Sequence, residues 1–436
     1  MTRRIWCEYA WLGGERPTAS VLLEITEGRF TAVTVDATAG DAQRRPGVSF
    51  PGFANGHSHA FHRALRGRTH DRPGSFWTWR EAMYRLAARL DPNAYFRLAR
   101  ATFSEMVSAG YTTVGEFHYL HHGPAGRPYE DPNEMGRTVI AAARDAGLRI
   151  TLLDTCYLHG GFDRPLDVVQ RRFGDGDVDA WASRVAALND AEGVRIGAAV
   201  HSVRACTPEE IAAIAAHSTD RPLHAHVSEQ PAENEGAVAR YGRTPTTILS
   251  DAGALGENFT AVHATHLTDA DIGLLATSTV CACPSTERDL ADGVGPFRRL
   301  LDAGARLTVG SDSNTVVDAF DEGRSLDLHE RLVSGERGRL SVGEILGALT
   351  DHGSLGWHDA GTIAVGARAD LVTVGLGSMR LAGSDPTSVL WTIVSAATPA
   401  DITHVTIDGV DRVSDGAYLA GDVVAEFDAL IPRLFA

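Results

Sequence analysis

Three histidines and one aspartate lie at the ends of short apolar runs that are far apart in this sequence of 436 residues. His57 and His59 belong to one such end, His226 to a second and Asp312 to a third. Residues i and i+2 of an extended chain point the same way, so His57 and His59 can reach one ion. Three imidazoles and one carboxylate suit zinc, or alternatively ferrous iron. The four residues are therefore candidate ligands of one divalent metal ion.

Each of these residues also has an ordinary structural interpretation. A His-x-His pair such as His57 and His59 occurs by chance, and the pair His224 and His226 can belong to a protein core. An aspartate after a strand is often only a helix cap. The 18 histidines of the chain raise this chance background further. The metal-site hypothesis depends on all four residues being placed by strand ends.

The region between residues 51 and 365 alternates short apolar runs with longer amphipathic stretches, which is typical of a parallel sheet. Helical patterns cover, for example, residues 93–109 and 208–216. Eight parallel units predict an α/β fold with a closed (β/α)₈ TIM-type barrel, whose functional residues gather where the strands end. The candidate strands are 48–53, 112–117, 148–153, 194–200, 222–226, 259–263, 279–283 and 306–310.

Both ends of the chain contain short β-rich runs separated by turns rich in glycine and aspartate. Examples are residues 20–25, 30–35, 370–374 and 404–407. We expect residues 1–50 and 366–436 to form one small discontinuous β-sandwich domain. Residues 51–365 would then form the metal-dependent barrel.

The composition excludes several classes of function. With 40 basic and 56 acidic residues the net charge is −16, which argues against nucleic-acid binding and against a basic membrane-binding surface. All 40 basic residues are arginine. Without lysine the chain cannot use a pyridoxal Schiff base, a P-loop lysine, a lysine nucleophile or a metal bridge built on a modified lysine.

The five cysteines are sparse and lie mostly in apolar runs, which favours free thiols in a reducing compartment over a disulfide framework. We expect Cys281 and Cys283 to be a buried apolar pair rather than metal ligands. Signal-peptide and membrane-spanning patterns are both missing from the sequence. The prediction is a cytoplasmic protein without a membrane partner.

Several segments resemble the amidohydrolase superfamily over nearly the whole chain. They are residues 51–59 (PGFANGHSH), the step from His226 to Glu229, His263, residues 310–313 (GSDS) and residues 366–372 (GARADLV). Within the superfamily the chain is most similar to the formimidoylglutamate deiminases of bacterial histidine degradation. That similarity is carried by residues 75–80 (SFWTWR), 116–122 (EFHYLHH), 159–162 (HGGF), 201–204 (HSVR) and 283–287 (CPSTE).

The resemblance implies a zinc-dependent hydrolysis of N-formimidoyl-L-glutamate to N-formyl-L-glutamate and ammonia. One zinc ion would be held by the four ligands named above. Glu229 and His263 would be the acid/base pair, with Asp312 taking part in catalysis. Glu229 would pass a proton to the departing nitrogen, because an amide ion is not a viable leaving group. Such acid/base assistance contributes roughly 10² to 10⁴ in rate.

The resemblance also implies which residues bind the small dicarboxylate substrate, and a homodimer is expected. The implied contacts are Arg80, Tyr119, His201 and Arg204. His62 is a departure, because it stands where the family pattern has a glutamine; we keep it as a candidate substrate contact. Arg80 and Arg204 are expected on loops after the first and fourth barrel strands, and their guanidinium groups suit two carboxylates.

Other functions remain open at this point. A deaminase of a guanine-, cytosine- or adenosine-like ring would share the metal and the mechanism but need a different pocket. A barrel that binds metal without catalysis is a second alternative, which the presence of Glu229 and His263 disfavours. Cleavage that releases formamide is a third, although enzymes with that activity resemble the arginase fold.

Overall fold

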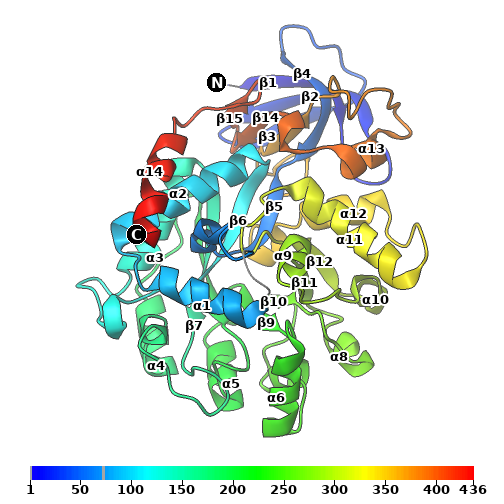
Figure 1. Ribbon diagram of the computed structural model, residues 1–436. Coiled ribbons are helices and arrows are strands. Elements are labelled where there is room, and N and C mark those ends of the chain that lie inside the picture. The colour runs from blue at the N-terminus through cyan, green and yellow to red at the C-terminus, as the bar shows by residue number, and fades with distance from the viewer. Residues whose placement is uncertain (1, 71–73) are drawn as a thin grey trace.

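The computed structural model describes residues 2–70 and 74–436, and its strands form two eight-stranded sheets (Figure 1). In one sheet, consecutive strands pair in parallel and in chain order. These strands are β5 (Phe53–Ser58), β6 (Tyr111–His118), β7 (Arg149–Cys156), β8 (Val194–Val200), β9 (Leu223–Val227), β10 (Phe259–His263), β11 (Thr279–Ala282) and β12 (Arg306–Val309). The predicted barrel of eight parallel units is confirmed.

The barrel closes between β5 and β12 through the residues that were predicted to bind metal. The amide of Asp312 donates a hydrogen bond to the carbonyl of His57, and the amide of His59 donates to the carbonyl of Asp312, both at 3.0 Å. Gly310 makes this close approach possible, because a Cβ atom there would lie 2.7 Å from the carbonyl oxygen of His57.

Helices follow the barrel strands and cover the outside of the sheet (Figure 1). They are α1 (Phe76–Ala87), α2 (Pro92–Ser108), α3 (Glu134–Ala146), α4 (Val178–Val185), α5 (Pro208–Ala216), α6 (Pro231–Tyr241), α7 (Pro245–Asp251), α8 (Asp269–Leu274), α9 (Pro284–Asp289), α10 (Phe297–Ala303), α11 (Ala319–Ser334) and α12 (Val342–Leu349). The predicted helices at residues 93–109 and 208–216 correspond to α2 and α5. The start of α5 is fixed by local chemistry, because Thr207 and Glu210 each accept the other's amide hydrogen.

The first barrel strand differs from its prediction at residues 48–53. Residues 48–51 end β4 (Gln43–Pro51), which belongs to the other sheet, and the barrel begins only with β5. The chain passes between the two sheets at Gly52, where a Cβ atom would lie 2.2 Å from Thr112 Oγ1. The apolar run is buried in either sheet, so its pattern does not reveal which sheet it joins.

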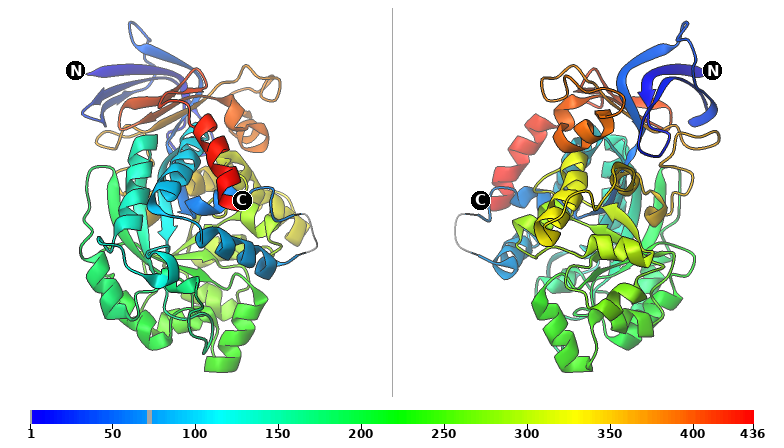
Figure 2. Two further views of the ribbon diagram at one scale, coloured as in Figure 1. Left: turned by 60° about the vertical axis from the view of Figure 1, so that its left-hand side comes forward. Right: turned by 90° about the vertical axis from the view of Figure 1, so that its right-hand side faces the viewer.

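The second sheet combines strands from both chain ends, as expected. It contains β4 with β1 (Arg3–Ala10), β2 (Thr18–Thr26), β3 (Arg29–Thr34), β13 (Leu371–Val374), β14 (Ile402–Ile407), β15 (Val410–Ser414) and β16 (Ala417–Tyr418). Its central pair is β4 and β13, which join the two ends antiparallel. Figure 2 shows this sheet at one end of the barrel in both views.

Two further helices of the C-terminal region contact helices of the barrel. Helix α13 (Val389–Ala396) contacts α11, and α14 (Val424–Phe435) lies along α2 (Figure 2). The α14 contact includes a 2.7 Å ion pair between Arg97 and Glu426. The division into residues 51–365 and the two chain ends stays a prediction.

The five cysteines are buried and free. Among residues 2–70 and 74–436, every helix is too short or too polar to span a lipid bilayer.

Candidate active site

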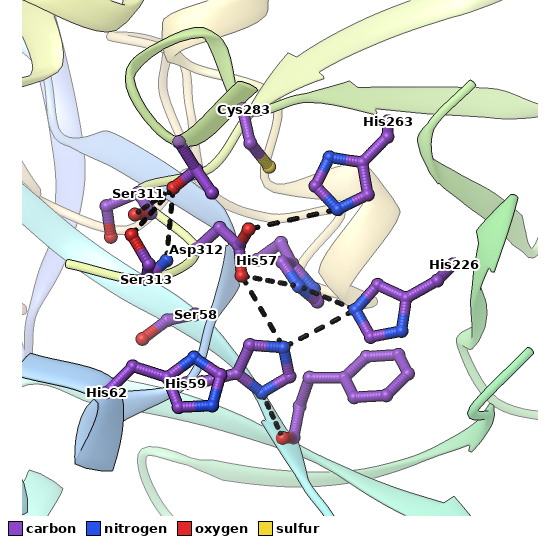
Figure 3. A network of polar contacts seen from close by, with 12 residues as sticks. His57, Ser58, His59, His62, His226, His263, Cys283, Ser311, Asp312 and Ser313 are labelled. Carbon is purple, nitrogen blue, oxygen red and sulfur yellow. Dashed lines mark hydrogen bonds and ion pairs between the residues drawn. The ribbon is translucent and has the colours of Figure 1, made fainter. Parts of the chain in front are cut away.

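Three histidine side chains from two barrel strands and one aspartate point toward one another (Figure 3). The Nε2 atom of His226 on β9 lies 3.2 Å from Nε2 of His57 and 3.4 Å from Nε2 of His59. Oδ1 of Asp312 lies 3.4 Å from His57 Nε2 and 3.5 Å from His59 Nε2. The barrel therefore brings together the four residues predicted as metal ligands.

The spacing of these four atoms fits a tetrahedral metal ion. Zinc–nitrogen bonds of about 2.0–2.1 Å place ligand atoms about 3.3–3.4 Å apart at the corners of a tetrahedron. Nitrogen lone pairs facing each other at 3.2 Å repel unless a proton or a cation lies between them. Burial lowers the pKa of His57, His59 and His226, which favours the neutral imidazole that binds metal. The residues present thus fit a divalent ion.

Backbone carbonyls orient two of the imidazoles. His59 Nδ1 donates to the carbonyl of Phe117 at 2.9 Å, and His226 Nδ1 donates to the carbonyl of His201 at 2.9 Å. A hydrogen on Nδ1 leaves the lone pair on Nε2, the atom that faces the cluster. The ends of β6 and β8 therefore fix the ligands that β5 and β9 carry.

His263 and Glu229 lie beside the ligand cluster. His263 Nε2 is 3.8 Å from Glu229 Oε1 and 3.8 Å from Asp312 Oδ2. His263 and Asp312 have left-handed backbones, with φ of 69° and 40°. Such strain in residues other than glycine is concentrated at functional sites.

Burial and charge act on the protonation of this pair in different ways. Burial raises the pKa of Glu229 above its ordinary value. Burial alone would lower the pKa of His263, but the neighbouring carboxylates Glu229, Glu287 and Asp312 together raise it well above its ordinary value. A carboxyl whose pKa is raised and a carboxylate-paired imidazole can both supply protons within one site.

The predicted substrate contacts line one small cavity of about 40 Å³ next to the ligand cluster. Its lining includes His62, Arg80, Tyr119, His201 and Arg204 together with Glu229, His263 and Asp312. A second cavity of about 190 Å³ shares Arg80, Tyr157, His201 and Arg204 with the first. The two cavities thus meet at the two arginines.

The two arginines of the cavity have different partners. Arg204 Nε lies 3.3 Å from Glu233 Oε1, and Arg204 Nη2 lies 3.8 Å from Glu229 Oε2. Arg80 lies over the ring of Tyr84 and donates to the hydroxyl of Tyr157 at 3.3 Å. Within the described part of the chain, Arg80 has no carboxylate at ion-pair distance. Its charge is available for an anionic ligand.

Arg80 lies on α1, within the long connection after β5, and not on a loop as predicted. The helix forms there because Thr78 accepts the amide hydrogen of Ser75 and caps its first turn. Arg204 does lie in the loop after β8.

His62 is held beside Tyr119. Its Nε2 atom lies 2.8 Å from the Tyr119 hydroxyl, and its Nδ1 atom is buried without a partner among the described residues. Burial lowers the pKa of His62 to about 3, so the ring is neutral. A neutral imidazole can hydrogen-bond the tyrosine as a glutamine amide would.

The sequence-based reasoning missed several polar residues of the site. Gln170 donates to the hydroxyls of Tyr84 and Tyr157, both at 3.0 Å. Glu287 Oε1 lies 3.4 Å from His263 Nδ1. Tyr157 follows β7 directly, so the rule that polar residues end barrel strands would have found it. Gln170 and Glu287 lie beyond strand ends, where spacing carries no signal.

Another buried group of His118, His121 and Asp154 has the residue types of a metal site. Arg184 donates to both carboxylate oxygens of Asp154, at 2.7 and 2.9 Å. A cation in that position would compete with the guanidinium, so the group is better described as a buried ion pair with neutral histidines.

Comparisons with known proteins agree with this fold and site. The family model described as "Amidohydrolase family" matches residues 48–412. Formimidoylglutamate deiminase of Pseudomonas aeruginosa is 37% identical over 418 residues, covering 92% of each chain. An 8-oxoguanine deaminase of the same species is 29% identical over 399 residues, covering 88% of this chain and 86% of the relative.

A solved structure extends the similarity to the whole molecule. The crystal structure of an amidohydrolase from Brucella melitensis matches with a TM-score of 0.91 and 32% identity, over 100% of both chains. The eight-stranded barrel, the four converging ligand atoms and these matches lead to one conclusion: this chain belongs to the amidohydrolase family.

Proposed function

We propose that this amidohydrolase removes ammonia from N-formimidoyl-L-glutamate and leaves N-formyl-L-glutamate. One observation carries the proposal: two guanidinium groups, those of Arg80 and Arg204, line the same cavity as Glu229, His263 and Asp312. The 37% identity to the formimidoylglutamate deiminase of P. aeruginosa supports the same substrate.

The cavities favour a linear substrate with an anionic tail. The inner cavity lies next to the ligand cluster, and the outer cavity shares the two arginines with it. The amidine group would lie in the inner cavity, while the carboxylates lie toward the arginines and the outer cavity. A guanidinium binds a carboxylate through two parallel hydrogen bonds, which gives both charge and orientation.

The metal in this proposal is a single zinc ion, held by His57, His59, His226 and Asp312. When bound, it would supply Lewis acidity that makes hydroxide available near neutral pH. Ferrous iron is the alternative for the same ligand set.

Both protons of the water end on the terminal nitrogen, and the site has two carboxyl groups that can carry them. Water adds to the amidine carbon and gives up its first proton; Asp312 Oδ2, next to His263 Nε2, is placed to take it. The carboxyl of Glu229, whose pKa burial raises, is placed to give a proton to the terminal nitrogen. The proton held by Asp312 then passes to the same nitrogen, the bond between carbon and nitrogen breaks, and ammonia leaves. The hydroxyl of the adduct gives its proton back to Glu229 as the formyl C=O bond forms, so both carboxyl groups return to their starting states.

A ring deaminase is the second candidate, since the relative that acts on 8-oxoguanine is 29% identical. Phe76, Trp79 and Tyr119 line the inner cavity and offer aromatic surface. Arg80 counts against it, because a neutral ring would leave its guanidinium without an anionic partner, and no carboxylate lies at ion-pair distance from Arg80 among the described residues.

A coupled ammonia assay of the zinc-loaded enzyme decides between these functions. The compounds are formimidoylglutamate, formimidoylaspartate, 8-oxoguanine, guanine, cytosine and adenosine. We expect the highest kcat/KM with formimidoylglutamate and a lower value with the shorter formimidoylaspartate. Ammonia from a ring compound, with none from formimidoylglutamate, would overturn the proposal.

A further inference from the structure

Glu233 is a buried carboxylate that contacts two residues of the proposed site, Arg204 and Glu229. It lies in the first turn of α6 and is only 1% exposed. Its Oε1 atom lies 3.3 Å from Arg204 Nε, and its Oε2 atom accepts the amide hydrogen of Glu229 at 3.3 Å. One side chain thus bridges a substrate-binding residue and a proton-transfer residue.

The contact with Arg204 fixes how the guanidinium faces the cavity. Glu233 engages the Nε edge at 3.3 Å and Nη2 lies 3.8 Å from Glu229 Oε2, so these carboxylates fix how the guanidinium lies in the cavity that Arg204 lines. Burial alone lowers the pKa of Arg204, but Glu233 and Glu229 raise it overall, so the charge persists in the interior. A long side chain held at its Nε loses less conformational entropy when a carboxylate binds to its other edge.

The contact with Glu229 is made to its backbone amide, next to a residue with a strained backbone. Ser228, the preceding residue, has a left-handed φ of 52°. The amide that follows it would be a buried donor without Glu233 Oε2, and an unpaired buried donor is costly. Glu233 therefore holds the turn that presents the Glu229 carboxyl to His263.

We propose that Glu233 is a positioning residue that couples recognition of the substrate carboxylate by Arg204 to proton transfer by Glu229. This inference rests on the proposed function of Arg204 and Glu229. Loss of Glu233 should therefore change both kinetic constants. The lost contact with Arg204 should raise KM, and the lost contact with the Glu229 amide should lower kcat.

The test is a set of double-substitution cycles in the zinc-loaded enzyme with formimidoylglutamate. Glu233→Gln is made alone, with Arg204→Met and with Arg80→Met, which removes an arginine that does not contact Glu233. Glu235→Gln is the matched control, because Glu235 is exposed on the same helix. Metal content and melting temperature are measured for every variant.

We expect Glu233→Gln alone to raise KM about tenfold and to lower kcat about tenfold, the loss of one charge-assisted contact in each case. With Arg204 already replaced, the effect on KM should shrink to less than about twofold while the effect on kcat remains, because residues that share a contact are not additive. With Arg80 replaced, both effects should persist. Glu235→Gln should match the unsubstituted enzyme.

The proposal would be overturned if Glu233→Gln changed KM and kcat by the same factors in the unsubstituted enzyme, in Arg204→Met and in Arg80→Met. Glu233 would then have only a structural role. If Glu233→Gln does not fold, Glu233→Asp takes its place, because it keeps the charge on a shorter side chain. Values of KM and kcat in metal-loaded Glu233→Asp equal to those of the unsubstituted enzyme would also overturn the proposal. No ammonia from formimidoylglutamate with the unsubstituted enzyme is a different failure, that of the proposed function, and the role of Glu233 falls with it.

Discussion

The Nε2 atoms of His57 and His226 lie 3.2 Å apart, although the two histidines belong to the first and fifth strands of the barrel. This distance matches the edge of a tetrahedron of ligand atoms around one metal ion, of which His59 and Asp312 would be the other two corners.

Replacement of His226 by alanine should remove the metal and the activity together, because two histidines and one carboxylate leave the ion undercoordinated. The measurement is metal content by elemental analysis alongside ammonia release. His224→Asn is the control: His224 lies on the same strand, but its Nε2 contacts the carbonyl of Ser354 at 3.1 Å instead. Stoichiometric metal in His226→Ala would contradict the ligand assignment.

The Glu229→Gln variant should keep its metal but lose turnover. Glutamine fills the same space and cannot deliver a proton, so kcat should fall about 10²- to 10⁴-fold. Metal analysis and steady-state kinetics on the same preparation separate the two effects. A near-normal kcat would mean that another group protonates the leaving nitrogen.

Arg80→Met should raise KM for formimidoylglutamate at least about tenfold, because a substrate carboxylate loses its charged partner. Arg80 has no competing carboxylate among the described residues, so its charge is not neutralised within the protein. Arg85→Met, an exposed change on the same helix, is the control. Unchanged KM for Arg80→Met would indicate that Arg80 only packs against Tyr84.

Glu116 should make the free energy of unfolding depend on pH. Burial raises the pKa of Glu116 to about 8, and its Oε2 atom has no partner among the described residues. Between about pH 4.5 and 8 the folded protein keeps a proton that the unfolded chain has released. The stability contribution of this group is therefore complete below about pH 4.5 and is lost as the pH rises toward 8.

The expected slope from Glu116 is up to about 1.4 kcal/mol per pH unit, with stability decreasing as pH increases. Urea unfolding at several pH values measures it. Glu116→Gln should flatten the curve over this range, whereas the exposed Glu235→Gln should leave it unchanged. The same pH dependence in Glu116→Gln would assign the slope to other groups.

His62→Gln should keep kcat and KM within about threefold of the unsubstituted enzyme, because either side chain can hydrogen-bond Tyr119. His62→Ala should raise KM, since the tyrosine hydroxyl then loses the neighbour 2.8 Å away. Steady-state kinetics of both variants check this. A KM for His62→Ala equal to that of the unsubstituted enzyme would show that the pair does not orient the substrate.

The barrel was predictable because parallel strands are short, apolar and regularly spaced, and seven of the eight candidate strands match. The first strand was placed too early, since the true strand Phe53–Ser58 contains the polar sequence Asn-Gly-His-Ser, which does not have a strand pattern. The predicted ligands converge because strand order alone determines which strand ends meet.

Contacts that depend on side-chain reach were not predictable. Glu233 and Glu287 enter the site from helices, where a buried carboxylate has the same sequence pattern as an exposed one. The family resemblance supplied Arg80, which lies on a helix and which no spacing rule singles out. The contacts of α13 and α14 with barrel helices were likewise not predictable, because an amphipathic helix does not specify its partner.

The backbone hydrogen bonds of Asp312 with His57 and His59 couple the assembly of the ligand set to the completion of the barrel. A chain emerging from the ribosome carries three of the four ligands long before the fourth, and the fourth arrives with the strand that seals the cylinder. The full set of ligands is thus assembled only when the last barrel strand has joined the first.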